Sequence, residues 1–305
     1  MKKQYLPYIL VLTLSLAMLM PACKDDDEPA NACAGVTCQN GGSCADGTCF
    51  CPDGFMGPNC EEVDPCYEAN TNNEWGYDDF GGPACWNDVC CGTGCSGDHQ
   101  SPINIVGAVP NTNLPELVFG QFVATPTKIV NKGHTIEFEQ EPGTYLTYGA
   151  TENGLSNDYT LGQFHFHAQS EHQVESNHAP LEAHLVFRSI WRNEYIVIGV
   201  MFEEGDSNPL LAQFVDHLPT SVTQPPYENE DLIYNAFDLL PADKSYFTYS
   251  GSLTTPPCSE VVTWMVMENK VQATAAEIEA FTELLHHNFR PVQPLNGRVI
   301  SHVQL

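Results

Sequence analysis

The chain has 305 residues, 42% of them hydrophobic, so it can bury a full-sized core and is not a disordered chain. Its 11 lysines and arginines face 39 aspartates and glutamates, and the formal charge of -28 disfavours binding to nucleic acid or anionic lipid. Such acidity suits a surface adapted to an extracellular or salty medium, and we infer no partner from it.

Residues 1–22 are predicted to be an export signal. Lys2 and Lys3 precede an apolar run over 9–20, which is too short to span a bilayer but suits the hydrophobic part of a signal peptide. The 13 cysteines, dense in the first third of the chain, also indicate an oxidising compartment in which disulfides form.

Cys23 is the predicted site of a lipid anchor. It follows Met20-Pro21-Ala22, which resembles a lipobox, and setting it aside leaves an even number of cysteines. We therefore expect a lipoprotein signal peptide, a lipid on Cys23 that anchors the chain to a bacterial outer membrane on the periplasmic or cell-surface side, and an acidic tether over 23–32. An ordinary cleaved leader is the alternative.

Six cysteines over 33–60 follow the spacing C-x4-C-x5-C-x4-C-x-C-x8-C, which resembles an EGF-like module. The spacing alone allows several pairings. The resemblance implies the pairs Cys33–Cys44, Cys38–Cys49 and Cys51–Cys60. Because so short a segment cannot build a hydrophobic core, disulfide bridges must hold it together.

We expect this module to be a spacer, with an adhesion element as the alternative, and its protein partner is unknown. The residues before its first cysteine, 29–32, carry no acidic side chain, which argues against calcium binding.

Beyond the module, long runs of β-branched and aromatic residues predict a mainly β domain over 66–305. Strands are expected at 134–140, 161–167, 183–191, 195–203 and 260–267. Two helices should interrupt them. The first begins at Asn208-Pro209 with Leu211, Phe214, Val215 and Leu218 on one face, and the second begins at Thr274, where Glu277 completes a capping box.

The segment Gln163-Phe164-His165-Phe166-His167 carries the densest chemical signal. Side chains alternate faces along a strand, so the two histidines project to one side and both phenylalanines to the other. His184, on a neighbouring predicted strand, would complete a set of three histidines that leaves one tetrahedral position open, as catalytic zinc requires. The competing interpretation is a pair of polar residues facing solvent.

Gln163 and Glu182 support the zinc interpretation. Each lies two residues before a histidine, on the same face of its strand, and could accept that histidine's second N–H.

Several further segments resemble an α-class carbonic anhydrase, and the resemblance covers nearly all of 75–305. They are Trp75-Gly76-Tyr77, Gln100-Ser101-Pro102-Ile103-Asn104-Ile105, Tyr249-Ser250-Gly251-Ser252-Leu253-Thr254-Thr255-Pro256-Pro257-Cys258, and Asn288-Phe289-Arg290-Pro291-Val292-Gln293-Pro294-Leu295-Asn296. The implied fold is a single domain around a large, twisted, mostly antiparallel sheet with short surface helices.

The resemblance implies zinc on His165, His167 and His184, with Gln163, Glu182 and the Asn288 carbonyl behind them. Thr254 and Glu171 would orient a hydroxide toward carbon dioxide, and His134 would carry the proton to buffer. The implied substrate pocket consists of Val186, Val197, Leu253, Thr255, Val262 and Trp264. From sequence alone these pocket residues are ordinary core residues.

His134 lies in Asn131-Lys132-Gly133-His134, and its alternative role is that of an exposed histidine at a strand edge. Lys132 replaces an asparagine common in the family, and its positive charge should lower the pKa of His134. His172 follows Glu171 and should point the opposite way in a strand, as a structural residue.

The remaining cysteines are interpreted as bridges. The resemblance implies Cys95–Cys258, which would brace the loop that carries Thr254. Cys66, Cys85, Cys90 and Cys91 depart from the family pattern, and their partners cannot be read from the sequence; a zinc site of thiols is the less favoured alternative outside the cell.

The expected function is the reversible hydration of carbon dioxide to bicarbonate and a proton. The alternative is a catalytically silent cell-surface binding or adhesion protein on the same scaffold. Silent relatives lose zinc-binding histidines, and all three are present here.

Overall fold

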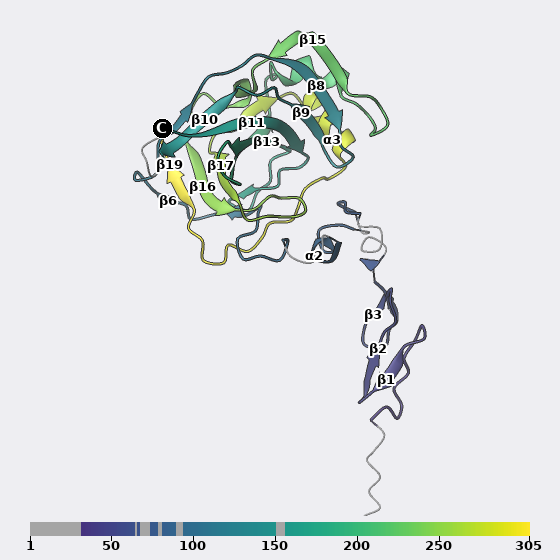
Figure 1. The fold of residues 1–305 in the computed structure, drawn as a ribbon. Helices are drawn as coiled ribbons and strands as arrows, with labels where there is room; N and C mark the ends of the chain where they lie inside the picture. The colour runs from purple at the N-terminus through teal and green to yellow at the C-terminus, as the bar shows by residue number, and fades with distance from the viewer. Residues whose placement is uncertain (1–31, 65, 68–73, 79–80, 90–93, 151–155) are drawn as a thin grey trace, which may run out of the picture. The chain divides into compact units, whose positions relative to one another are not determined.

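The computed structural model describes residues 32–64, 66–67, 74–78, 81–89, 94–150 and 156–305 (Figure 1). The predicted signal peptide, Cys23 and nearly all of the predicted tether lie outside these residues. The chain divides into two compact units, Met1–Glu62 and Val63–Leu305. No helix within the described segments has the length and apolar character needed to cross a membrane.

The described part of the first unit is held by disulfides rather than by a core. Strands β1 (Ser43–Ala45) and β2 (Thr48–Phe50) form one antiparallel hairpin, and β3 (Phe55–Met56) pairs with β4 (Glu62–Val63). Cys60 is the single buried residue among 32–62. The bridges are Cys33–Cys44, Cys38–Cys49 and Cys51–Cys60, the same pairs that the EGF-like resemblance implies.

The second unit is built on a 13-stranded mixed sheet, most of whose neighbouring strands are antiparallel. The main path runs β15-β8-β9-β11-β13-β14-β17-β16-β19-β6, while β10 pairs with β11 and β7, and β18 pairs with β14. The parallel pairs are β14 with β17, β14 with β18, and β19 with β6. This mainly β architecture is the one that the sequence predicts.

The strands of this unit have the following bounds: β5 Asn104–Ile105, β6 Val109–Pro110, β7 Leu117–Phe119, β8 Thr125–Asn131, β9 Ile136–Glu139, β10 Tyr145–Ala150, β11 Ser156–His167, β12 Gln173–Val174, β13 Leu181–Ser189, β14 Tyr195–Glu204, β15 Tyr227–Tyr234, β16 Tyr246–Gly251, β17 Val262–Met267, β18 Val271–Ala273 and β19 Ser301–Val303. The short β5 and β12 pair with each other outside the large sheet.

Alternation along the central strands separates a large core from a polar site. On β11, Phe164 and Phe166 are fully buried in the larger hydrophobic cluster, and His165 and His167, which alternate with them, belong to the other face. On β13, Ala183 and Leu185 join the same cluster. The sheet therefore buries one face of these strands in a core and leaves the other face for polar side chains.

Helix α3 (Ala275–Leu285) begins at the predicted capping box, in which Thr274 and Glu277 satisfy each other's backbone N–H groups. Its Phe281 packs on Phe166, with ring centroids 4.4 Å apart. Helix α2 (Trp86–Val89) is a single turn.

The prediction of an α-helix after Asn208-Pro209 is wrong. The segment forms two 3₁₀ turns, Leu211–Gln213 and Val215–His217, although Leu211, Phe214 and Leu218 are buried as expected. Leu218 is extended, with ψ of 124°, because the residue before a proline is disfavoured in the helical region, and Pro219 follows. Pro219 thus sets the end of the segment at Leu218.

Two other local expectations need correction. The strand predicted at 134–140 spans only Ile136–Glu139, so His134 lies in the turn between β8 and β9. Glu171 and His172 lie in a bend before β12 rather than in a strand.

Candidate metal centre

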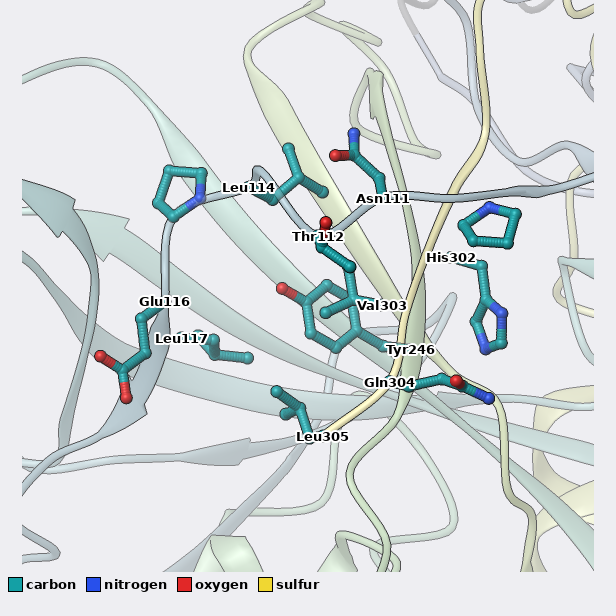
Figure 2. A pocket seen from close by; sticks show the side chains of 12 residues that line it. Asn111, Thr112, Leu114, Glu116, Leu117, Tyr246, His302, Val303, Gln304 and Leu305 are labelled. Atoms are coloured by element: carbon teal, nitrogen blue, oxygen red, sulfur yellow. The ribbon is translucent and has the colours of Figure 1, made fainter.

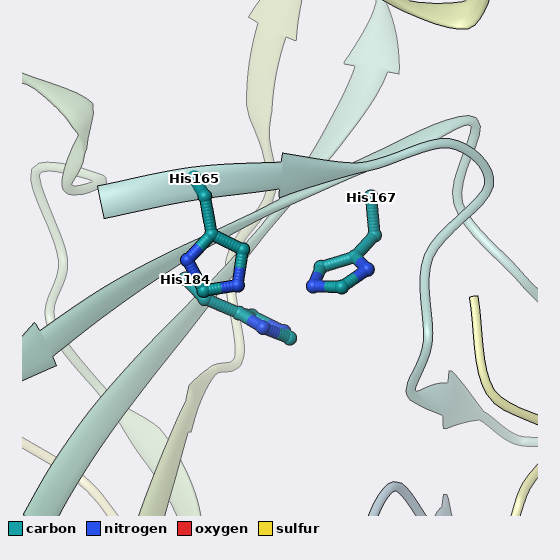
Figure 3. Close-up of side chains that lie close together, drawn as sticks. All are labelled: His165, His167 and His184. Carbon is teal, nitrogen blue, oxygen red and sulfur yellow. The ribbon is translucent and has the colours of Figure 1, made fainter. Parts of the chain in front are cut away.

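Three histidines converge on the polar face of β11 and β13 (Figure 3). His165 and His167 are two residues apart on β11, and His184 lies directly across from His165 in the antiparallel register. Each offers a ring nitrogen, and these atoms all lie within 4.8 Å of one another. The period of two within a strand and the register between strands are therefore sufficient to bring the three rings together.

The outer nitrogen of each ring is held by a partner, which fixes the orientation of the inner one. His165 Nδ1 lies 2.8 Å from Gln163 Oε1, His167 Nδ1 lies 2.6 Å from the Asn288 carbonyl oxygen, and His184 Nε2 lies 3.0 Å from Glu182 Oε1. An acceptor at each outer position makes that nitrogen the protonated one. The inner nitrogens, two Nε2 atoms and one Nδ1, are left with lone pairs.

Burial keeps the three rings neutral. It lowers the pKa of His165 well below its ordinary value, with the charges of His167 and His184 acting in the same direction. Burial also lowers the pKa of His167 to about 4, and lowers that of His184 despite the opposing effect of Glu182. Neutral imidazole is the form that binds metal.

Glu171 lies beside this cluster, completely buried. Its Oε1 accepts the Arg290 backbone N–H at 2.8 Å, while Oε2 lies 3.6 Å from His167 Nε2. Burial raises the pKa of Glu171 to about 7, although His184, a hydrogen bond from the Thr254 side chain and the Arg290 N–H oppose the rise. The structure thus brings Thr254 and Glu171 together next to the histidines.

The predicted apolar pocket residues lie in the smaller hydrophobic cluster, on the histidine side of the sheet. Val197, Val262 and Trp264 are buried there, and Val186 and Leu253 pack against them. The Trp264 ring centroid is 4.8 Å from that of His184. The sixth predicted residue, Thr255, is half-buried, and its carbonyl accepts the Cys258 N–H at 2.8 Å within the same loop.

His134 is half-buried, and its ring centroid lies 4.3 Å from that of Trp75. Its carbonyl oxygen accepts a hydrogen bond of 3.0 Å from the Asn288 side chain, whose backbone holds His167. Burial lowers the pKa of His134, and His167 and Lys132 lower it further, as expected for Lys132.

These residues fit a zinc ion. Three buried neutral imidazoles with oriented inner nitrogens match the ligand set of a catalytic zinc site with one open position. Within the described residues, the buried His167 Nε2 and Glu171 Oε2 have no hydrogen-bond partner, and a buried polar atom left this way costs stability. A cation held at the inner nitrogens would remove that cost for His167.

A family model of the eukaryotic-type carbonic anhydrase matches residues 81–304. The chain belongs to this carbonic anhydrase family. A second family model, that of an EGF-like domain, matches residues 30–60. The match over most of the chain supports carbon dioxide hydration as the activity of this enzyme.

Known carbonic anhydrases align with most of the chain. That of Pectobacterium carotovorum is 39% identical over 246 residues, which cover 78% of this chain and 95% of the relative. The solved structure of the α-carbonic anhydrase of Thermovibrio ammonificans, in complex with the inhibitor sulfanilamide, has a TM-score of 0.67 at 35% identity and covers 75% of this chain and 98% of its own. The solved structure of the Photobacterium profundum α-carbonic anhydrase has the same TM-score and identity, and the match covers 76% of this chain and 100% of that one.

Sequence reasoning did not find the buried network behind His184 in this carbonic anhydrase. His172 places Nδ1 2.8 Å from Glu182 Oε1 and Nε2 2.7 Å from the Tyr249 hydroxyl, and Tyr249 donates to Ser101 Oγ at 3.0 Å. His172 thus pairs with Glu182 and Tyr249. Its structural role stays a prediction, because His172, Glu182 and His184 also form a group that could hold a metal ion. Tyr249 and Ser101 both lie in segments that resemble the family, but nothing in the sequence predicts that their side chains form a hydrogen bond.

Arg290 is a second residue that the sequence did not single out. Its guanidinium donates to Gln100 Oε1 at 2.9 Å and to the carbonyls of Ser101 and Cys95 at 2.7 and 3.0 Å. The side chain of Arg290 therefore ties the stretch 95–101 to the segment whose backbone N–H binds Glu171.

The loop that carries Thr254 is braced by the Cys95–Cys258 disulfide that the resemblance implies. Cys66 pairs with Cys85, a pairing that the sequence left open. Cys90 and Cys91 lie outside the described residues.

Proposed function

We propose that this chain holds a zinc ion on His165, His167 and His184 and uses it for the reversible hydration of carbon dioxide to bicarbonate and a proton. The observation that carries the proposal is the set of three inner ring nitrogens within 4.8 Å of one another, each oriented by an acceptor on the opposite side of its ring. Zinc in such a site acts as a Lewis acid that makes a nucleophile available from water near neutral pH.

Thr254 and Glu171 would position that nucleophile. The Thr254 hydroxyl would donate a hydrogen bond to the Glu171 carboxylate, which the Arg290 N–H also holds. A hydroxyl that donates its hydrogen bond to a carboxylate can only act as a hydrogen-bond acceptor toward a second partner. Thr254 would therefore select an O–H donor and orient its lone pair. The positive charge of a zinc ion held by the neutral histidines would favour the ionised form of Glu171.

The apolar cluster would hold carbon dioxide beside this group. Val186, Val197 and Trp264 provide a surface with no hydrogen-bond donor toward the substrate except the Trp264 indole, whose N–H is already bonded to the Ser252 carbonyl at 3.0 Å. An apolar wall accepts an uncharged, linear molecule and favours release of the charged bicarbonate.

His134 would carry the released proton to buffer. It is half-buried at the turn between β8 and β9, and an imidazole is the side chain that titrates near neutral pH.

The purified protein should contain about one zinc per chain and hydrate carbon dioxide in a stopped-flow assay. Complete chelation should abolish the activity, and added zinc should restore it, because without the cation the neutral histidines cannot activate water. Activity that survived full chelation would refute the zinc assignment. Zinc-loaded protein without activity would instead favour the silent binding protein.

Lys132→Asn should raise the pKa of His134, because it removes the positive charge of Lys132, which adds to the effect of burial in holding this pKa below its ordinary value. The other two causes that lower the pKa of His134, burial and His167, are unchanged in this variant. The ring-proton NMR titration of His134 reports the change, and the protonated fraction at a given pH should increase.

Lys128→Asn is the matched control. Lys128 and Lys132 both pair with Glu139, at 2.7 and 3.2 Å, but only Lys132 contributes to the shift of His134. An equal rise in both variants, or none in Lys132→Asn, would contradict the assignment.

We also propose that Cys23 is lipidated and anchors the chain to the outer membrane of a bacterium; the support is the sequence of the leader. Cells fed a tagged fatty acid should label the protein, and Cys23→Ser should lose the label and shift to the soluble fraction, whereas Glu28→Ser should keep both. A soluble, unlabelled parent protein would show an ordinary cleaved leader instead.

A further inference from the structure

A pocket separate from the histidine cluster lies where the segment after β6 meets the C-terminal strand (Figure 2). Its volume is about 260 Å³, just below the range of about 300–1,000 Å³ typical of sites for drug-sized ligands. It can therefore hold a compact organic molecule. The lining residues that matter here are Thr112, Leu114, Glu116, Leu117, Tyr246 and Val303.

Tyr246, on β16, is the polar residue at the centre of this lining. Its side chain is completely buried, yet among the described residues its hydroxyl has no hydrogen-bond partner. Figure 2 shows the ring between the segment of Thr112 and Leu114 and the C-terminal residues Val303 and Leu305. A buried hydroxyl without a partner costs stability, and a ligand that supplies one recovers that cost.

The hydroxyl keeps its proton at physiological pH. Burial raises the pKa of Tyr246 to about 12, and Tyr148 adds to the rise. It therefore offers a hydrogen-bond donor rather than a negative charge.

The charges around the pocket disfavour an anionic ligand. Glu116 lies in the lining and the chain as a whole carries -28, so an anion is repelled. The one histidine of the lining, His302, already places Nε2 2.9 Å from Glu268. The remaining wall is mainly apolar, with Leu114, Leu117 and Val303 among its side chains, and it also carries the uncharged polar residues Asn111, Thr112 and Gln304.

We propose that this pocket binds a compact organic molecule that carries no negative charge, with an apolar body and one oxygen that accepts a hydrogen bond from Tyr246. The proposal is independent of zinc, because none of the lining residues belongs to the histidine cluster or its partners.

The test uses cyclohexanone as the probe, because it is uncharged, compact and carries a single acceptor oxygen. It is titrated into the zinc-loaded full chain while methyl NMR signals of Leu117 and Val303 are followed. We expect saturable shifts at these two residues, about fivefold weaker binding in Tyr246→Phe, and no binding in Thr112→Trp, where the exposed rim residue is replaced by a ring that fills the pocket.

Tyr234→Phe is the matched control, since the Tyr234 hydroxyl is hydrogen-bonded to Gln140 and lies outside the pocket; it should bind the probe like the parent protein. The absence of saturable shifts in the parent protein up to the solubility of the probe, or equal affinity in the parent, Tyr246→Phe and Thr112→Trp, would overturn the proposal. Tyr246→Phe removes a hydroxyl that has no partner, so it should fold; Thr112→Trp gives an independent answer if it does not.

Discussion

Replacing His184 with alanine should remove the bound zinc and reduce carbon dioxide hydration by more than about a hundredfold. The loss of a residue that only supports a metal ligand costs about 10–100-fold in metal affinity or activity, and the loss of the ligand itself should cost more. The fold should survive, because Ala183 and Leu185 on the opposite face still fill the large core. Zinc per chain, stopped-flow hydration and circular dichroism measure the three expectations.

His217→Ala is the control for this variant. His217 is an exposed histidine that stacks on Tyr227 with ring centroids 4.4 Å apart, and it has no part in the cluster. It should keep both zinc and activity. If His184→Ala retained stoichiometric zinc or parental turnover, a different set of ligands would have to hold the metal.

The part of the site that could be predicted from sequence depends on local periodicity. His165, His167 and Gln163 share a face because side chains on a strand alternate, and Glu182 and His184 share one for the same reason. The observed register, with His165 opposite His184, then joins the two sets. The same alternation predicts the core, since Phe164 and Phe166 occupy the other face.

The rest of the site depends on contacts between distant segments. Tyr249 meets His172 across 77 residues, and the Arg290 N–H reaches Glu171 across 119. A single tyrosine or arginine carries no periodic signal, and such residues are usually exposed, so only the tertiary structure shows that they are buried and paired. Resemblance to a family supplied Glu171 and Thr254, which the residue pattern alone leaves as ordinary surface side chains.

The prediction of local structure from the sequence also failed at one segment, where two signals competed. Asn208-Pro209 predicts the start of a helix, and the Asn208 side chain does accept the N–H groups of Leu210 and Leu211. Pro219 then ends the segment, because Leu218 before it is extended, and two 3₁₀ turns form in place of the expected α-helix. The pocket at Tyr246 was missed for a different reason, because it forms only where the segment around Thr112 meets residues near 303.

Glu182→Gln should weaken zinc binding by about 10–100-fold and lower the free energy of unfolding of the metal-free protein by about 1–3 kcal/mol. The fully buried Glu182 carboxylate accepts hydrogen bonds on both oxygens: Oε2 from the His172 backbone N–H at 2.9 Å, and Oε1 from the rings of His172 and His184 at 2.8 and 3.0 Å. Glutamine has only one acceptor oxygen, so at least one of these buried donors loses its partner. The charge that favours the orientation of His184 is lost as well.

Glu268→Gln is the matched comparison, because Glu268 also pairs with a histidine, His302, at 2.9 Å, but at a partly exposed position. Water can replace a partner there, so its effect on unfolding should stay within about 0.5 kcal/mol and zinc binding should not change. Zinc affinity from competition with a chelator and unfolding in urea measure both variants. Equal behaviour of the two would show that Glu182 does not support His184, and that the orientation of this ligand comes from packing against Trp264, whose ring centroid lies 4.8 Å away.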